Sequence, residues 1–131
     1  MALYMVLLPP PRRGMFYTKS VHMSLTLRTD LGCTEAIIDD DCGLKRFYEV
    51  ADILADDLDI NYLQKIDDFD SMTWDFKYRN HMLTLYYNIY TGVSIYPKKF
   101  READRKDNEA VIKIARFLDE KLMIQMIRKA V

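Results

Sequence analysis

Apolar and polar residues alternate along several short stretches of the chain, a pattern typical of strands that bury one face. The first stretch is 17–27, where most odd positions are apolar and the even positions are mainly polar. A weaker stretch covers 60–66, and clear ones cover 72–78 and 83–89. With the segment 93–97 after a further turn, the pattern predicts four to five strands.

Two other segments repeat their apolar residues every three or four positions, as amphipathic helices do. In the segment 44–58 the apolar stripe consists of Leu44, Phe47, Ala51, Leu54 and Leu58. The second helix is expected to start from a cap at Asp107 or Asn108 and to run to about Arg128. Both helices therefore have an apolar side that needs a sheet to pack on.

Residues 30–43 are predicted to form a loop, because Gly32 and Gly43 bracket a polar, acid-rich stretch. The element order is then β-α-β-β-β-β-α. The simplest architecture for this order is an α+β fold, in which two helices cover one face of an antiparallel meander of four to five strands.

The hairpins of the meander can be assigned a register, because a one-residue slip would turn every side chain to the other face. A two-residue turn at 80–81 pairs Tyr78 with Leu83 and keeps the apolar residues on one side. A three-residue loop at 90–92 does the same for the next hairpin, and it requires Gly92 in a left-handed backbone conformation.

The 131 residues are enough for one domain, which we place at 15–131. Residues 1–14 contain an apolar run, three prolines and two arginines, and we set them aside as a flexible leader or as a start assigned too early. Met15 and Met23 are later candidate starts. The segment lacks the order of a secretory signal and is too short to span a bilayer, so no membrane association is predicted.

The charges are distributed very unevenly along the chain. Its formal net charge is only −1, yet residues 30–75 contain 14 acids and three bases, and residues 76–131 contain 12 bases and six acids. Four acids, Glu49, Asp52, Asp56 and Asp59, follow helical steps on nearly the opposite side from the apolar stripe. They predict an acidic ridge on the first helix.

An acidic ridge suits docking on a basic protein, because opposite charges speed the encounter and select the partner. We predict a non-enzymatic protein-binding domain of inhibitor or immunity type, with a toxin or nuclease as an example of its basic partner. The expected partner-binding residues are Asp39, Asp40, Asp41, Glu49, Asp52, Asp56 and Asp59 for steering, with Tyr86 and Tyr96 as anchors. Two alternatives stay open, namely that the acids serve solubility or that they pair with the basic C-terminal helix of the same chain.

The C-terminal end of the second helix suggests another function. After Leu122 it becomes apolar nearly all round, at Met123, Ile124, Met126 and Ile127. Such an end is clamped between elements or meets another chain, so the alternative is a structural or chaperone-like assembly protein, for example a homodimer. In size and element order the layout resembles small bacterial immunity proteins and secretion chaperones, a resemblance that assigns no site residues.

Catalytic motifs are absent from the sequence. It has no nucleophile elbow, phosphate loop or dinucleotide-binding glycine pattern, and we predict that the protein is not an enzyme. His22 and His81 are expected to be exposed surface residues. A deep pocket that placed either histidine beside a carboxylate would favour an enzyme instead.

Metal, cofactor and nucleic-acid binding are not expected either. Cys33 and Cys42 lie nine positions apart without a second pair, so we predict two free thiols in a reducing cytoplasm and no zinc site. The triple acid 39–41 lacks the ligand spacing of a calcium loop. Since the domain is not basic overall, direct binding of nucleic acid is not predicted.

Overall fold

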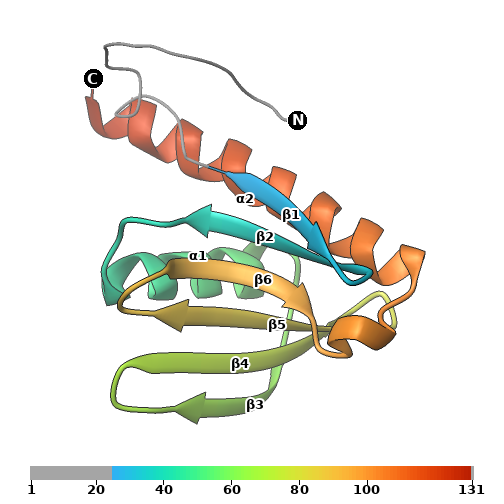
Figure 1. Ribbon diagram of the computed structural model, residues 1–131. Helices are drawn as coiled ribbons and strands as arrows, with labels where there is room; N and C mark the ends of the chain where they lie inside the picture. Colours follow the sequence, from blue (N-terminus) through green and yellow to red (C-terminus); the bar gives the residue numbers. More distant parts are fainter. Residues whose placement is uncertain (1–24, 131) are drawn as a thin grey trace, which may run out of the picture.

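The computed structural model describes residues 25–130, which form six strands and two long helices (Figure 1). The elements are β1 (Thr26–Asp30), β2 (Cys33–Asp39), α1 (Leu44–Asp57), β3 (Tyr62–Asp67), β4 (Ser71–Tyr78), β5 (His81–Asn88), β6 (Gly92–Pro97), the 3₁₀ turn η3 (Phe100–Glu102) and α2 (Arg105–Ala130). The predictions for residues 1–14, for His22 and for most of the strand at 17–27 lie outside the described residues.

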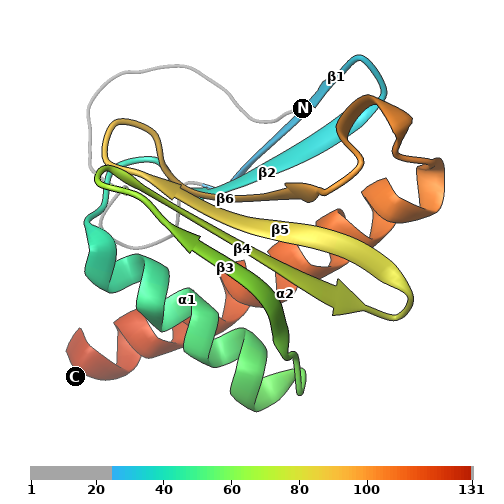
Figure 2. The same cartoon turned by 90° about the horizontal axis from the view of Figure 1, so that it is seen from below.

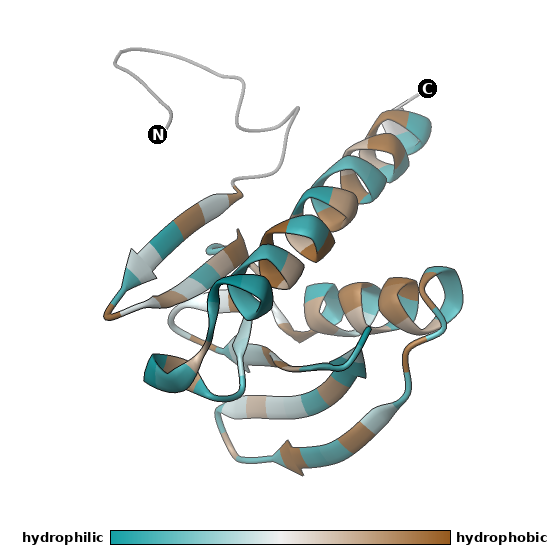
Figure 3. Ribbon diagram, turned by 90° about the vertical axis from the view of Figure 1, so that its right-hand side faces the viewer, coloured by the Kyte–Doolittle hydropathy of each residue, from teal (hydrophilic) through white to brown (hydrophobic). Residues whose placement is uncertain are grey.

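The strands of this part of the chain form one antiparallel sheet in the order β1-β2-β6-β5-β4-β3. Figure 2 shows both helices on the same side of the sheet, with α2 packed on β2, β6 and β5 and α1 on β5. Bands of hydrophobic and hydrophilic residues alternate along the strands (Figure 3). The α+β class and the two helices on one face are confirmed, whereas the sheet has six strands rather than four to five.

The additional strand is β2, which the sequence analysis placed in a loop. Ala36 and Ile38 are buried on the helix side of this strand, so the alternation was present within the acid-rich stretch. Leu31 and Gly32 connect it to β1 through a two-residue turn in which both φ angles are positive, 53° and 80°. Gly32 is therefore a hairpin residue, and the observed order is β-β-α-β-β-β-β-α.

The β4–β5 hairpin turns at Arg79 and Asn80, whose φ angles are 49° and 69°. Tyr78 consequently pairs with His81, so the predicted pairing with Leu83 was wrong by two residues. Because side chains alternate with a period of two, this shift leaves every apolar residue on its predicted face. Hydrophobic patterning alone cannot distinguish the two registers.

The β5–β6 hairpin differs from its predicted register in the same way, since Asn88 pairs with Gly92 and the connecting loop is 89–91. The left-handed conformation of Gly92 is confirmed by its φ of 81°. A Cβ atom at this position would overlap the carbonyl oxygen of Asp39, beside the irregular β2–β6 pairing between Ile37 and Asp39. Only glycine lets the two strands approach here.

Helix α1 matches its prediction closely. Phe47, Ala51 and Leu54 are buried, and the ring of Phe47 packs edge-on against Trp74 with centroids 4.9 Å apart. Leu44, at the first helical position, is 42% exposed and contributes little to the core. The buried stripe therefore starts one turn later than predicted.

Helix α2 begins at Arg105, and its cap is Asp104 rather than Asp107 or Asn108. The Oδ1 atom of Asp104 accepts the N–H of Asp107 at 2.8 Å, and Oδ2 of Asp107 accepts the N–H of Asp104 at 3.1 Å. These reciprocal bonds form a capping box. Asn108 holds the β1–β2 hairpin instead, because its side chain binds the N–H of Thr34 and the carbonyl of Gly32.

Candidate functional site

Helices α1 and α2 border a hollow of about 280 Å³ with acidic walls. Its lining residues are Glu49, Asp52, Ile53, Asp56, Asp57, Lys121 and Gln125. Four carboxylates thus surround a single ammonium group. Three of the four belong to the predicted ridge of α1, and α2 supplies the opposite wall.

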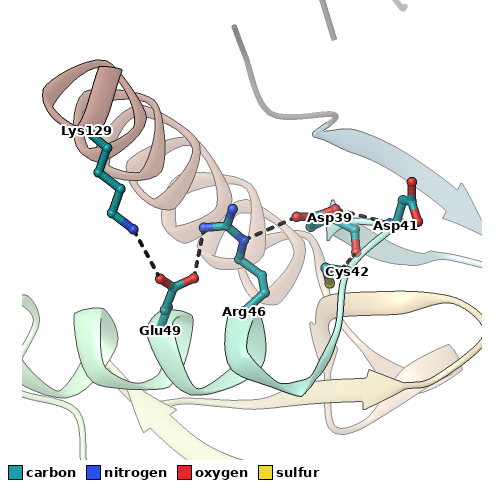
Figure 4. A network of polar contacts seen from close by, with 6 residues as sticks. All are labelled: Asp39, Asp41, Cys42, Arg46, Glu49 and Lys129. Atoms are coloured by element: carbon teal, nitrogen blue, oxygen red, sulfur yellow. Dashed lines mark hydrogen bonds and ion pairs between the residues drawn. The ribbon is translucent and has the colours of Figure 1, made fainter. Parts of the chain in front are cut away.

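Two of these carboxylates are paired with lysines of α2. The Nζ atom of Lys121 lies 2.9 Å from Oδ2 of Asp57. Glu49 contacts Lys129 at 3.8 Å and, through its other oxygen, Arg46 at 3.2 Å (Figure 4). The alternative that the acids pair with the chain's own basic helix therefore holds for part of the ridge, with at most about 1 kcal/mol per exposed pair.

Asp52 and Asp56 are exposed and form no ion pair with any residue in the described range 25–130. They lie four positions apart on α1, where like charges repel each other by a few tenths of a kcal/mol. The charge of Asp52 also affects Tyr62. Burial raises the pKa of the Tyr62 phenol most, and the Asp52 carboxylate raises it further. These two carboxylates are the uncompensated part of the hollow.

The remaining acids of the prediction lie outside the hollow. Helix α1 ends at Asp57, and Asp59 follows it in a left-handed conformation with a φ of 56°, so Asp59 does not continue the ridge. Asp40 and Asp41 are exposed in the connection between β2 and α1. That Asp40, Asp41 and Asp59 steer a basic partner toward the protein stays a prediction, and it concerns the surface beside the hollow.

Asp39 has a different role, because it is only 9% exposed. Its carboxylate accepts the N–H of Asp41 at 3.1 Å and lies 3.2 Å from the Nε atom of Arg46 (Figure 4). It therefore fastens the end of β2 to the first turn of α1, and its predicted place on an exposed docking surface is wrong. The nearby thiol of Cys42 has its pKa raised to about 11 by burial and by the Asp39 charge.

Tyr86 and Tyr96 lie on the side of the sheet away from the helices. Their ring centroids are 6.0 Å apart, and Tyr96 stacks on Phe100 at 4.9 Å. They line a groove of about 780 Å³ together with Arg28, Thr29, Asp30, Leu31, Cys33, Glu35, Phe100 and Arg101. The predicted anchors and the acidic ridge consequently do not form one continuous patch.

His81 is not the exposed turn residue that the sequence suggested. Its side chain is 24% exposed, and its Nδ1 atom lies 2.7 Å from Oδ1 of Asp107. The two residues are 26 positions apart, so only the packing of the β4–β5 hairpin on α2 brings them together. A histidine does lie beside a carboxylate here, at the edge of a cavity of about 420 Å³.

The apolar C-terminal end of α2 separates into two sets. Met126 packs against the core and Met123 is half-buried, whereas Ile124 and Ile127 are 42% and 52% exposed. The isoleucines alone remain available as an apolar surface. Both cysteines are free thiols, as predicted.

No family model, curated protein or solved structure matches this chain. Its function must therefore be argued from its own residues. Within 25–130, no three histidines, cysteines or acids are placed to hold a metal ion, and no helix has the length and apolar character needed to cross a membrane.

Proposed function

We propose that this protein is a non-enzymatic binding domain, of inhibitor or immunity type, that docks its acidic interhelical hollow on a basic partner protein. The observation that carries the proposal is that Asp52 and Asp56 line the hollow without an ion-pair partner among the described residues, whereas its other two carboxylates, Glu49 and Asp57, are already paired. Asp52 and Asp56 repel each other and contribute little to folding. A cationic side chain of a partner would supply their missing counter-charge.

The chemistry of the hollow favours an arginine or lysine side chain as its ligand. A guanidinium group binds carboxylates through two parallel hydrogen bonds, and charge-assisted bonds of this kind are about twice as strong as neutral ones. Complementary charge also raises the association rate and excludes acidic partners. A nuclease or toxin with a basic surface fits this description, and the two free thiols favour a reducing cytoplasm as the location.

The proposal is tested with a fluorescent hexa-arginine peptide as the probe. We expect the double variant Asp52→Lys/Asp56→Lys to bind the peptide at least about tenfold more weakly at low salt, because both unpaired carboxylates are lost and two cations are added. Fluorescence anisotropy measures the dissociation constants. The difference between variant and wild type should shrink at about 0.5 M salt, where screening shortens the range of the charges.

The matched control is Asp68→Lys/Asp70→Lys, which makes the same change of net charge in the turn between β3 and β4. We expect it to weaken binding by no more than about threefold, through the long-range field alone. Equal weakening by the two double variants would show that the peptide responds only to net charge. That result would contradict a site in the hollow.

A second candidate function, self-assembly, is favoured by the two exposed isoleucines of α2. Ile124 and Ile127 lie one helical turn apart, so they form a small apolar surface. If they join two copies, sedimentation velocity at about 1–100 µM should show a dimer that Ile124→Ser/Ile127→Ser converts to a monomer. Leu63→Ser, at an apolar residue that is 61% exposed on β3, is the control. A wild-type protein that is monomeric throughout this range excludes the candidate.

A further inference from the structure

A cavity of opposite charge lies where the β4–β5 hairpin meets the first turns of α2. Its volume is about 420 Å³, and it is lined by Tyr78, Arg79, His81, Lys106, Glu109, Ala110 and Lys113. Arg79, Lys106 and Lys113 are exposed and make no ion pair with the residues that the structure describes. The acid in the lining, Glu109, already has Arg105 as a partner at 3.8 Å.

The buried carboxylate of Asp107 fixes the orientation of His81. Burial alone would raise the pKa of Asp107, but hydrogen bonds from His81 and from the N–H of Asp104, with the charge of Lys99, lower it below the ordinary value of 3.8. An ionised carboxylate only accepts hydrogen bonds, so the Nδ1 atom of His81 must carry the proton in their 2.7 Å contact. His81 lines the cavity, and its Nε2 atom makes no hydrogen bond within residues 25–130.

The His81–Asp107 contact by itself only fastens the hairpin to the helix. Fastening does not account for the three cations around the same cavity, none of which has an ion-pair partner among the described residues. The guanidinium group of Arg79 lies 5.3 Å from the ring centroid of Tyr78. The cavity is also within the size range of small-molecule sites, about 300–1,000 Å³. The combination of three cations and a hollow of this size is typical of an anion site rather than of a solvated surface.

We propose that this cavity binds a tetrahedral oxyanion, such as the phosphate group of a small molecule, between Arg79, Lys106 and Lys113. The three cations supply the charge and the hydrogen-bond donors, and the His81–Asp107 contact joins the hairpin that carries Arg79 to the helix that carries the two lysines. This site is separate from the acidic hollow and does not depend on the function proposed for it.

The test is a titration with sodium sulfate at constant ionic strength, with chloride as the balancing anion. Backbone amide NMR signals near the cavity, Ala110 above all, are expected to shift and saturate. We expect Lys113→Gln to weaken sulfate binding about five- to tenfold, through the loss of one charge-assisted bond. The control is Arg116→Gln, an exposed position on the same helix that does not line the cavity, where we expect less than about a twofold change.

Shifts that do not saturate, or equal weakening by the two variants, would overturn the proposal in favour of diffuse electrostatic attraction. Pyrophosphate and a ten-residue oligothymidylate, titrated in the same way, separate a small phosphorylated ligand from a nucleic-acid backbone. Tighter binding of pyrophosphate at the Ala110 amide supports the proposal. Preference for the oligonucleotide, with shifts spread beyond the cavity, would overturn it.

Discussion

Replacing Gly92 with alanine is expected to lower the free energy of unfolding by about 3–5 kcal/mol, enough to unfold a marginal domain. The new Cβ atom would overlap the backbone oxygen of Asp39, which no side-chain rotation can relieve. The φ of 81° adds a left-handed penalty of about 1–2 kcal/mol for any residue with a Cβ. Urea denaturation followed by circular dichroism measures the loss.

Two other glycines separate these contributions. Gly32 has a φ of 80° with nothing within 4 Å of its Cβ position, so Gly32→Ala should cost only the left-handed penalty. Gly43 has an ordinary backbone conformation and equally open surroundings, so Gly43→Ala should cost only about 0.5–1 kcal/mol, because alanine is a poorer N-cap for α1 than glycine. If Gly92→Ala lowered the free energy of unfolding no more than Gly32→Ala, this result would contradict the close approach of β2 and β6.

Phe47→Ala is expected to cost about 3–5 kcal/mol, the usual loss for removing a buried aromatic side chain. Phe47 is 0% exposed, and its ring packs against those of Trp74 and Tyr87, with centroids 4.9 and 6.1 Å away. Phe69→Ala removes the same atoms at a fully exposed position and should change stability by less than about 0.5 kcal/mol. Thermal and urea unfolding of both variants measure the difference. A loss below about 1 kcal/mol for Phe47→Ala would contradict the packing of α1 on the sheet.

Gly92→Ala and Phe47→Ala would both disturb the position of the acidic hollow. Phe47 holds α1 against β4 and β5, and Gly92 allows the strand end that carries Asp39 to sit where its carboxylate binds Arg46. Arg46 in turn contacts Glu49 at 3.2 Å. The ridge is therefore supported by the core on one side and by an ion-pair chain at its start.

The elements with a clear periodicity could be predicted from the sequence. Helix α1 follows from its stripe, and β4 follows from its strict alternation. Strand β2 was missed because acids and glycines around it resemble a loop, although Ala36 and Ile38 carry the buried face. The hairpin registers were wrong because a shift of two residues conserves the faces, and only the turn residues with positive φ, such as Asn80, fix them.

The candidate site was predictable only where it depends on one element. The exposed acids Asp52 and Asp56 follow from the helical period of α1, whereas the hollow requires the position of α2. The separation of Tyr86 from this ridge could have been anticipated, because its position alternates with the core residues that face the helices. The pairing of His81 with Asp107 could not, since no local pattern joins residues 26 positions apart.

The most direct measurement is paramagnetic relaxation enhancement from a hexa-arginine peptide that carries a nitroxide, recorded on the isotope-labelled protein. We predict that the strongest broadening falls on the amides of Asp52, Ile53 and Asp56, and on that of Gln125 across the hollow. An excess of the same peptide without the nitroxide should reverse this broadening. Broadening centred on the β3–β4 turn or on the groove of Tyr86 and Tyr96, or spread evenly over all the acids, would contradict a dedicated cation site between α1 and α2.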